Sequence, residues 1–173
     1  MLLVTPPNTI KEKSVDTNFW LWLKVGTKLQ CDYRPEEKAS AVLYLVFGEV
    51  PGDDNKALDL FEACLDFYNC GHKDRGVPAP NEQLIDWEYD SPTIWADFKM
   101  YANIDLDEME YIHWWEFYSL FQSLPPHSRI KELIGIRSED LNDYSGKGQE
   151  KIREKKRHAK IMAAIEYTDN EDY

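Results

Sequence analysis

The sequence has too few cysteines for a disulfide scaffold and no apolar run long enough to cross a membrane. It contains three cysteines in 173 residues, an odd number that does not fit a fully paired disulfide framework. No stretch reaches the ~18 consecutive apolar residues of a membrane span. Residues 1–7 lack the basic region and apolar run of a secretory signal. We therefore expect a reducing compartment, the cytoplasm, and no membrane partner.

Aromatic residues, by contrast, are plentiful. They make up 13% of the chain, with six Trp and ten Tyr, and hydrophobic residues as a whole make up 43%. A domain of this length buries roughly 70% of the surface of its unfolded chain. Disordered chains are poor in aromatic residues, so the composition predicts a folded protein with a substantial core.

Acidic residues outnumber basic ones, and the two signs are unevenly distributed. The net charge is −12. Residues 1–144 carry thirteen Lys and Arg against twenty-six Asp and Glu, residues 145–165 carry seven against two, and residues 166–173 carry four acids. A mainly acidic surface repels nucleic acid, so we expect no direct nucleic-acid binding. The pattern predicts an acidic helical domain over 1–144, with an arm at 1–15, and a hinge, basic helix and acidic tail over 145–173.

Helical periodicity dominates the chain and predicts a mainly α fold. Apolar residues recur at helical spacing between proline, glycine and acidic capping positions. Residues 84–89 alternate apolar and acidic and suggest a short extended piece, while Pro6 and Pro7 make residues 1–15 an extended arm or a short hairpin. The expected helices cover about 18–29, 35–48, 54–69, 91–101, 107–124, 128–136 and 149–165.

The helix expected over about 107–124 is apolar nearly all round. It contains Trp114, Trp115 and Phe117 within four consecutive positions, so these side chains point in different directions. A helix without a polar face is buried on several sides. We therefore expect a compact helical domain around this buried aromatic central helix, with Trp114 or Trp115 essentially buried.

No residue pattern predicts a catalytic centre, a cofactor site or a metal site, and we expect no enzymatic activity. Cys64, Cys70 and His72 lack a partner pair at zinc-ligand spacing, which favours buried or inert thiols. His113 has no nearby Ser or Cys at a turn typical of a nucleophile, which favours a core histidine bonded to backbone or to a carboxylate. The clustered acids are expected to cap helices rather than to catalyse: Asp86, Glu88, Asp90, Asp105, Asp107 and Glu108.

The basic segment after Gly146 and Gly148 is the candidate interaction site. Three interpretations stay open: docking on the acidic domain of the same chain, a solvated helix, and a site for a partner. The glycines leave the backbone free to pivot, and the apolar stripe of the helix is thin, so we expect it to project or to pack weakly. The partner contacts would come from Lys151, Arg153, Lys155, Lys156, Arg157 and Lys160.

A series of sequence blocks forms a recognisable pattern. The blocks are DTNF at 16–19, LYLVFGEVP at 43–51, FYNCG at 67–71, WEYDSPTIWADF at 87–98, YANIDL at 101–106, YIHWWEF at 111–117 and IGIR at 134–137. Together they resemble the bacteriophage gene-product-fifteen family, which occurs in tailed phages and prophages of Gram-positive bacteria. The most specific part is the block from Asp90 to Phe117 with its His-Trp-Trp centre. Asn18 departs from the pattern, because the family's Asp-Phe motif has an acid there.

The resemblance implies a small helical protein of the tail-morphogenesis gene block, encoded near the tape-measure gene. Proteins in that position are usually tail assembly chaperones, which coat the tape-measure protein until tail-tube subunits replace them. The implied partners are the tape-measure protein and, second, the tail-tube protein; we also consider self-association. The protein would act in the cytoplasm of the bacterial host and be absent from the mature virion or minor in it. The resemblance implies no catalytic residues.

An acidic decoy is the alternative function. A protein that mimics nucleic acid and inhibits a basic host protein would also be strongly acidic. Such a mimic would gain little from a basic helix, however. A tape-measure gene beside the coding sequence would favour the chaperone.

Overall fold

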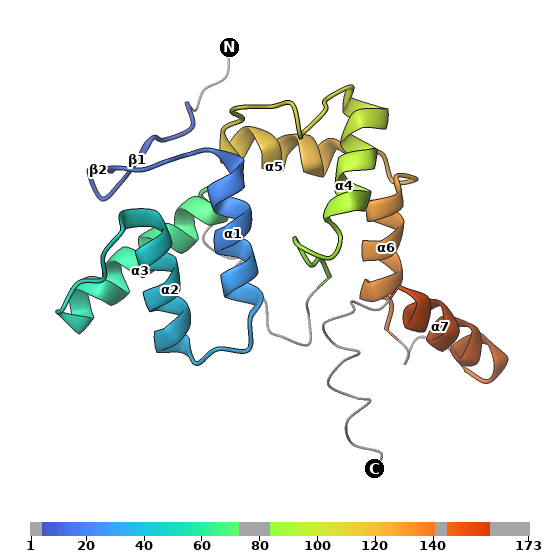
Figure 1. Cartoon of the computed structure of the whole chain (residues 1–173). Helices are drawn as coiled ribbons and strands as arrows, with labels where there is room; N and C mark the ends of the chain where they lie inside the picture. The colour runs from blue at the N-terminus through green and yellow to red at the C-terminus, as the bar shows by residue number, and fades with distance from the viewer. Residues whose placement is uncertain (1–4, 73–83, 141–144, 160–173) are drawn as a thin grey trace. The chain divides into compact units, whose positions relative to one another are not determined.

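Helices make up most of the computed structural model, which describes residues 5–72, 84–140 and 145–159 (Figure 1). One two-stranded sheet accompanies them in these ranges. The mainly α fold is therefore confirmed. No helix in the described ranges is both long enough and apolar enough to cross a membrane.

The chain forms two compact units that do not follow the order of the sequence. The first comprises residues 1–81 and 107–123, and the second comprises residues 82–106 and 124–173. The boundary predicted at residue 145 lies inside the second unit, and a separate domain over 145–173 stays a prediction. The two units are described one after the other.

The first unit begins with a β-hairpin. Strands β1 (Thr9–Ile10) and β2 (Lys13–Ser14) pair antiparallel, and Lys11 and Glu12 between them have φ angles of 48° and 64°. Two consecutive left-handed residues are typical of the tight turns that fit the twist of a hairpin. Ile10 is buried, and β1 packs against α3 (Asp54–Tyr68). The arm predicted at 1–15 is thus a hairpin over its described residues.

Three helices follow, and local signals explain most of their ends. Helix α1 (Phe19–Gln30) begins after Asn18, whose N–H donates to Asp16 Oδ1 at 2.8 Å. Helix α2 (Pro35–Phe47) begins with proline and ends at Gly48, which has a φ angle of 75°. Helix α3 begins where the Asp53 carboxylate accepts the N–H of Lys56. Helix α2 packs against both α1 and α3.

The central helix is shorter than predicted. Helix α5 spans Trp114–Ser123, so the helix expected over 107–124 is wrong for residues 107–113. The cause is backbone pairing with the chain before α1: Phe19 N–H donates to Ile112 C=O at 2.9 Å, and Trp114 N–H donates to Thr17 C=O at 2.8 Å. A backbone N–H that donates to another segment cannot also donate to the carbonyl four residues before it, so the helix can begin only at Trp114. Asn18 adds to the contact, because its Nδ2 donates to Glu110 C=O at 2.9 Å.

Asn18 joins the chain before α1 to the chain before α5. A carboxylate at this position could not donate to the Glu110 carbonyl, because an ionised carboxylate only accepts hydrogen bonds. The amide makes that bond, and the backbone of Asn18 forms an isolated antiparallel bridge with His113. Asn18 therefore has a structural role at the junction between α1 and α5.

Stacked aromatic rings fill the core of the first unit. Phe19 stacks on Phe117 with ring centroids 4.9 Å apart, and Trp114 stacks on Tyr68 at 5.2 Å. Trp114 is fully buried and its Nε1 donates to Tyr68 C=O at 2.8 Å. A buried Trp needs such a partner for its N–H. The prediction that Trp114 or Trp115 is essentially buried is confirmed by Trp114.

In the second unit, helix α4 (Ser91–Asp97) runs directly into a π-helical turn, η3 (Phe98–Ala102). Residues 87–89, predicted to be part of a short extended piece, form a turn with Asp90 instead. Asp90 Oδ2 accepts the N–H of Asp86 at 2.9 Å, and Asp86 Oδ1 accepts the N–H of Glu88 and of Tyr89 at 2.9 and 2.8 Å. Such local side-chain bonds replace the strand ladder.

Helices α6 (Arg129–Ser138) and α7 (Lys147–His158) complete the second unit. The Asp97 carboxylate caps α6 from another element, since it accepts the N–H of Arg129 at 3.3 Å and of Ile130 at 2.8 Å. Helix α7 packs on α6. It starts two residues before the predicted 149, and the predicted end at 165 lies outside the described residues.

Candidate interaction sites

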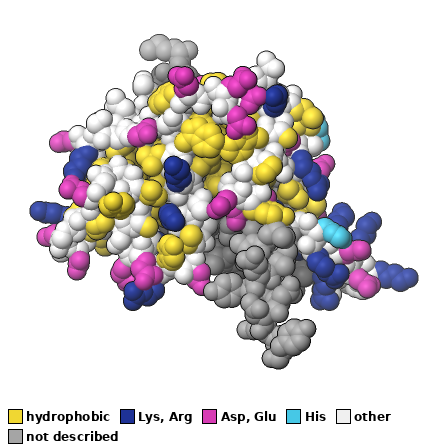
Figure 2. Space-filling view, viewed as in Figure 1, with side chains coloured by type: hydrophobic (Ala, Val, Ile, Leu, Met, Phe, Trp, Pro, Cys, Tyr) yellow, Lys and Arg dark blue, Asp and Glu magenta, His cyan; other side chains and the backbone are white. Residues whose placement is uncertain are grey.

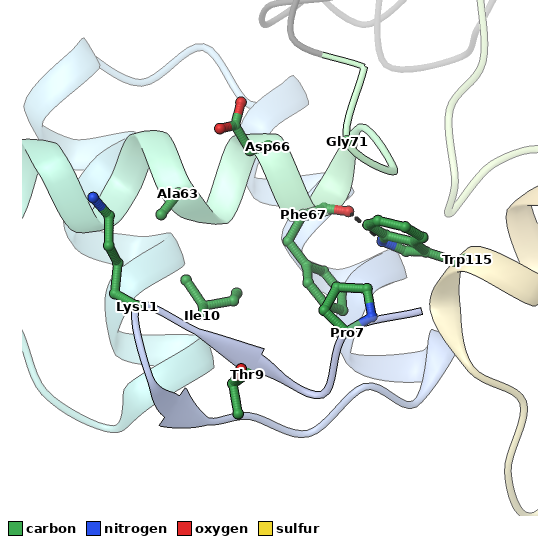
Figure 3. Close-up of a pocket in the computed structure, with 9 residues that line it drawn as sticks. All are labelled: Pro7, Thr9, Ile10, Lys11, Ala63, Asp66, Phe67, Gly71 and Trp115. Atoms are coloured by element: carbon green, nitrogen blue, oxygen red, sulfur yellow. Dashed lines mark hydrogen bonds between the residues drawn. The ribbon is translucent and has the colours of Figure 1, made fainter. Parts of the chain in front are cut away.

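A shallow notch lies in the first unit between the hairpin and α3 (Figure 3). Its volume is about 250 Å³. The apolar part comes from Ile10, Ala63 and Phe67, and Trp115 stands at one end. The full set of lining residues is Pro7, Thr9, Ile10, Lys11, Ala63, Asp66, Phe67, Gly71 and Trp115.

The end of the notch at Trp115 is held by several hydrogen bonds. Trp115 Nε1 donates to Phe67 C=O at 2.9 Å, and its backbone N–H donates to His113 Nδ1 at 3.1 Å. His113 Nε2 lies 3.0 Å from the Pro7 carbonyl. Gly71 closes this end with a φ angle of 78°, in the left-handed region that favours glycine. The expectation that His113 is bonded to backbone is confirmed, and its role here is to join the arm to the wall of the notch.

Acidic side chains follow the α3 side of the notch. Lys11 Nζ is 2.8 Å from Asp59 Oδ1, and both side chains are more than half exposed. The hydrogen bond that Lys11 donates to Asp59, and then the charge of Asp59, raise the pKa of Lys11 above its ordinary value, with smaller contributions from Glu62 and Asp66. Three acids thus act on one cation, so this edge of the first unit is negative.

A buried ion pair organises the second unit. Arg137 Nη1 is 2.6 Å from Asp90 Oδ2 and Nη2 is 2.9 Å from Oδ1, while the two side chains are 7% and 1% exposed. The guanidinium also donates to two backbone carbonyls, of Leu84 at 2.9 Å and of Ala159 at 2.6 Å. We call Asp90, Arg137 and these two carbonyls the clamp. It joins the chain before α4, the end of α6 and the end of α7.

Asp90 corrects one expectation from the sequence. It occupies the N-cap position of α4, as predicted, but its side chain makes no capping hydrogen bond there. The carboxylate instead binds Arg137 and the N–H of Asp86. A bidentate pair between Arg and a carboxylate fixes geometry as well as charge. Sequence spacing gave no signal for it, because the partners lie 47 positions apart.

Lys and Arg side chains gather on the surface where helix α7 lies (Figure 2). Ile152 and Ala159 are 6% and 3% exposed and form the anchored side. Lys156 is half-buried and its Nζ donates to Arg137 C=O at 3.1 Å. The exposed cations are Lys151, Arg153, Lys155 and Arg157, while Lys160 lies outside the described residues. The helix therefore packs on α6 through few apolar contacts, with the clamp added at its end.

The candidate metal ligands lie in the first unit. Cys64 is fully buried, and this burial raises the pKa of its thiol to about 12. Cys70 is half-buried and His72 is exposed. Within the described ranges, no group of three or more His, Cys, Asp or Glu side chains is arranged to hold a metal ion.

The comparisons with known proteins give one match. The family model described as Bacteriophage Gp15 protein matches residues 9–162, which is most of the chain. Neither the curated proteins nor the solved structures contain a match.

Proposed function

The chain belongs to the Bacteriophage Gp15 protein family, and from this premise we propose that it is a tail assembly chaperone that binds the tape-measure protein. In this proposal it acts in the host cytoplasm, keeps its client available for assembly, and gives way to the tail-tube protein. It would be absent from the mature virion or minor in it.

The anchored basic face of α7 is the observation that carries the proposal. Four exposed cations, Lys151, Arg153, Lys155 and Arg157, lie along the two flanks of the exposed side of α7, while Ile152 and Ala159 are buried on its other side. A surface that is ordered before binding loses less conformational entropy when a partner docks. An acidic segment of a long client is the partner whose charge fits this face.

Each single contact would be weak, and their number matters. Exposed ion pairs are worth about 0–1 kcal/mol each and are screened beyond roughly 10 Å at 0.1 M salt. Several acting together give an association that is useful but reversible, which suits a chaperone that must be displaced. The proposal therefore expects client binding that weakens steeply as salt increases.

Co-expression with the tape-measure protein of the same phage or prophage, followed by pull-down, tests this. The triple variant Lys151→Glu, Arg153→Glu, Lys155→Glu should lose most of the captured client, because it reverses three contacts of the exposed face. The matched control is Lys13→Glu, Lys24→Glu, Lys56→Glu, which changes the net charge equally through exposed cations of the first unit. The control should retain the client.

Two results would contradict the proposal. One is capture of the same amount of client by the α7 variant as by the parent protein. The other is an equal loss in both triple variants, which would indicate a response to net charge alone. Thermal melts of each variant exclude loss through unfolding.

A further inference from the structure

The notch of the first unit has the size of a peptide-binding site. Its volume of about 250 Å³ lies below the ~300–1,000 Å³ of typical small-molecule pockets. A hollow of this kind accommodates one or two side chains of a docked segment. The docked segment needs an apolar side chain that packs against the apolar lining of the notch, formed by Ile10, Ala63 and Phe67.

The charges beside the notch indicate which residues should flank the apolar anchor of the docked segment. Asp59, Glu62 and Asp66 follow one another along α3 beside the notch, and Lys11 supplies a single cation among them. The local balance is therefore negative. A suitable segment carries Lys or Arg next to its apolar anchor, because complementary charge steers association and fixes its register.

The chain itself contains such a segment. Directly after Ala159, where the described residues end, the sequence continues with Lys160 and then the apolar run 161–165, Ile-Met-Ala-Ala-Ile. Arg157 precedes it. The segment 157–165 thus combines cations with branched and flexible apolar side chains, in the arrangement that the notch requires.

We propose that the notch of one copy binds the segment 157–165 of a second copy, with an apolar residue of 161–165 in the notch and Lys160 beside Asp66. The described residues of the first unit carry seven Lys and Arg against fifteen Asp and Glu, whereas α7 carries six against two. Two copies therefore attract each other when the basic end of one meets the first unit of the other. Such a contact is head-to-tail, so it leaves a free notch and a free segment and builds rings or chains.

Photo-crosslinking in the full chain tests the site directly. A photoreactive amino acid replaces Ala63, which lines the notch, and the protein is prepared as an equal mixture of light and heavy isotope forms. Trypsin cuts after Lys160, so the expected product links residue 63 to the peptide 161–173, with half of the links joining light to heavy chains. The control places the same group at Leu58, which is 55% exposed on α3 outside the lining of the notch; it should not give this product.

A charge swap tests the pairing. Asp66→Lys and Lys160→Asp, each alone, should weaken self-association about fivefold in sedimentation velocity experiments. The double variant restores the opposite charges and should recover the association of the parent protein.

The experiments use the protein alone, so their outcome is separate from binding of the tape-measure protein. Crosslinks confined to chains of the same isotope would overturn the proposal, because the segment would then dock within its own chain. A protein that stays monomeric at all concentrations would overturn it as well. So would a double variant whose self-association is as weak as that of the two single variants.

Discussion

Removal of Arg137 is the sharpest test of how the second unit is held together. Arg137→Met keeps most of the length of the side chain and removes the guanidinium. The carboxylate of Asp90, which is 1% exposed, then keeps only the N–H of Asp86 among the hydrogen bonds described for it. The carbonyls of Leu84 and Ala159 lose their donor at the same time.

The expected cost is large. Breaking a buried ion pair by removing one partner destabilises a protein by about 3–5 kcal/mol, because an uncompensated charge stays buried. For a chain of this length, that corresponds to a fall in melting temperature of about 10 °C. The matched control is Arg129→Met on the same helix, whose ion pair with Glu132 is exposed; it should change stability by less than about 0.5 kcal/mol.

Thermal and urea unfolding measure the cost, and amide exchange locates it. Because the guanidinium holds Ala159 C=O, α7 should exchange faster in Arg137→Met, while α1 and α5 should not change. The double variant Asp90→Leu, Arg137→Met should recover much of the loss, since well-packed apolar residues often replace a buried pair without penalty. An unfolding midpoint in Arg137→Met equal to that of the control would refute the reasoning.

Two further predictions concern the first unit. Trp114→Ala should lower the free energy of unfolding by about 3–5 kcal/mol, because the side chain is fully buried and stacked. The control Tyr44→Ala, at a 65% exposed position, should change stability little. Equal melting points of the two variants in thermal melts would contradict this prediction. Cys64 should resist thiol reagents at pH 8 while Cys31 and Cys70 react, since burial raises the pKa of its thiol to about 12. The thiol ionises near pH 8.5 in the unfolded chain but stays protonated when buried, so the contribution of Cys64 to stability falls from about pH 9 toward pH 12. The free energy of unfolding measured against pH tests this. An equal slope in this range for Cys64→Ala and the parent protein would refute the account.

Local sequence signals determined most ends of α1, α2 and α3. Pro35 starts α2, Gly48 ends it in the left-handed conformation, and the Asp53 carboxylate starts α3. Each signal acts within four residues of the backbone group that it serves, so it can be read without knowledge of the fold. The burial of Cys64 on the apolar side of its helix followed from the same periodicity.

Elements governed by distant partners could not be predicted in this way. The late start of α5 depends on backbone pairing with Thr17 and Phe19, almost a hundred positions earlier. The Asp90 carboxylate pairs with Arg137 instead of capping its own helix, and this pairing depends on α6, which carries Arg137. In both cases a local preference was overridden by hydrogen bonds that exist only after distant segments have packed together.

The sequence by itself determined the helical class, the aromatic core, the family and the identity of the cations at 151–157. Composition, periodicity and charge are properties of neighbouring residues, and they do not require a fold. Only the tertiary structure decided which side of α7 is exposed, since Ile152 and Ala159 are buried, the helix packs on α6, and the clamp holds the end of the helix. It alone created the notch, because Ile10 comes from the hairpin and Ala63 and Phe67 come from α3, and they meet only when the hairpin lies against α3.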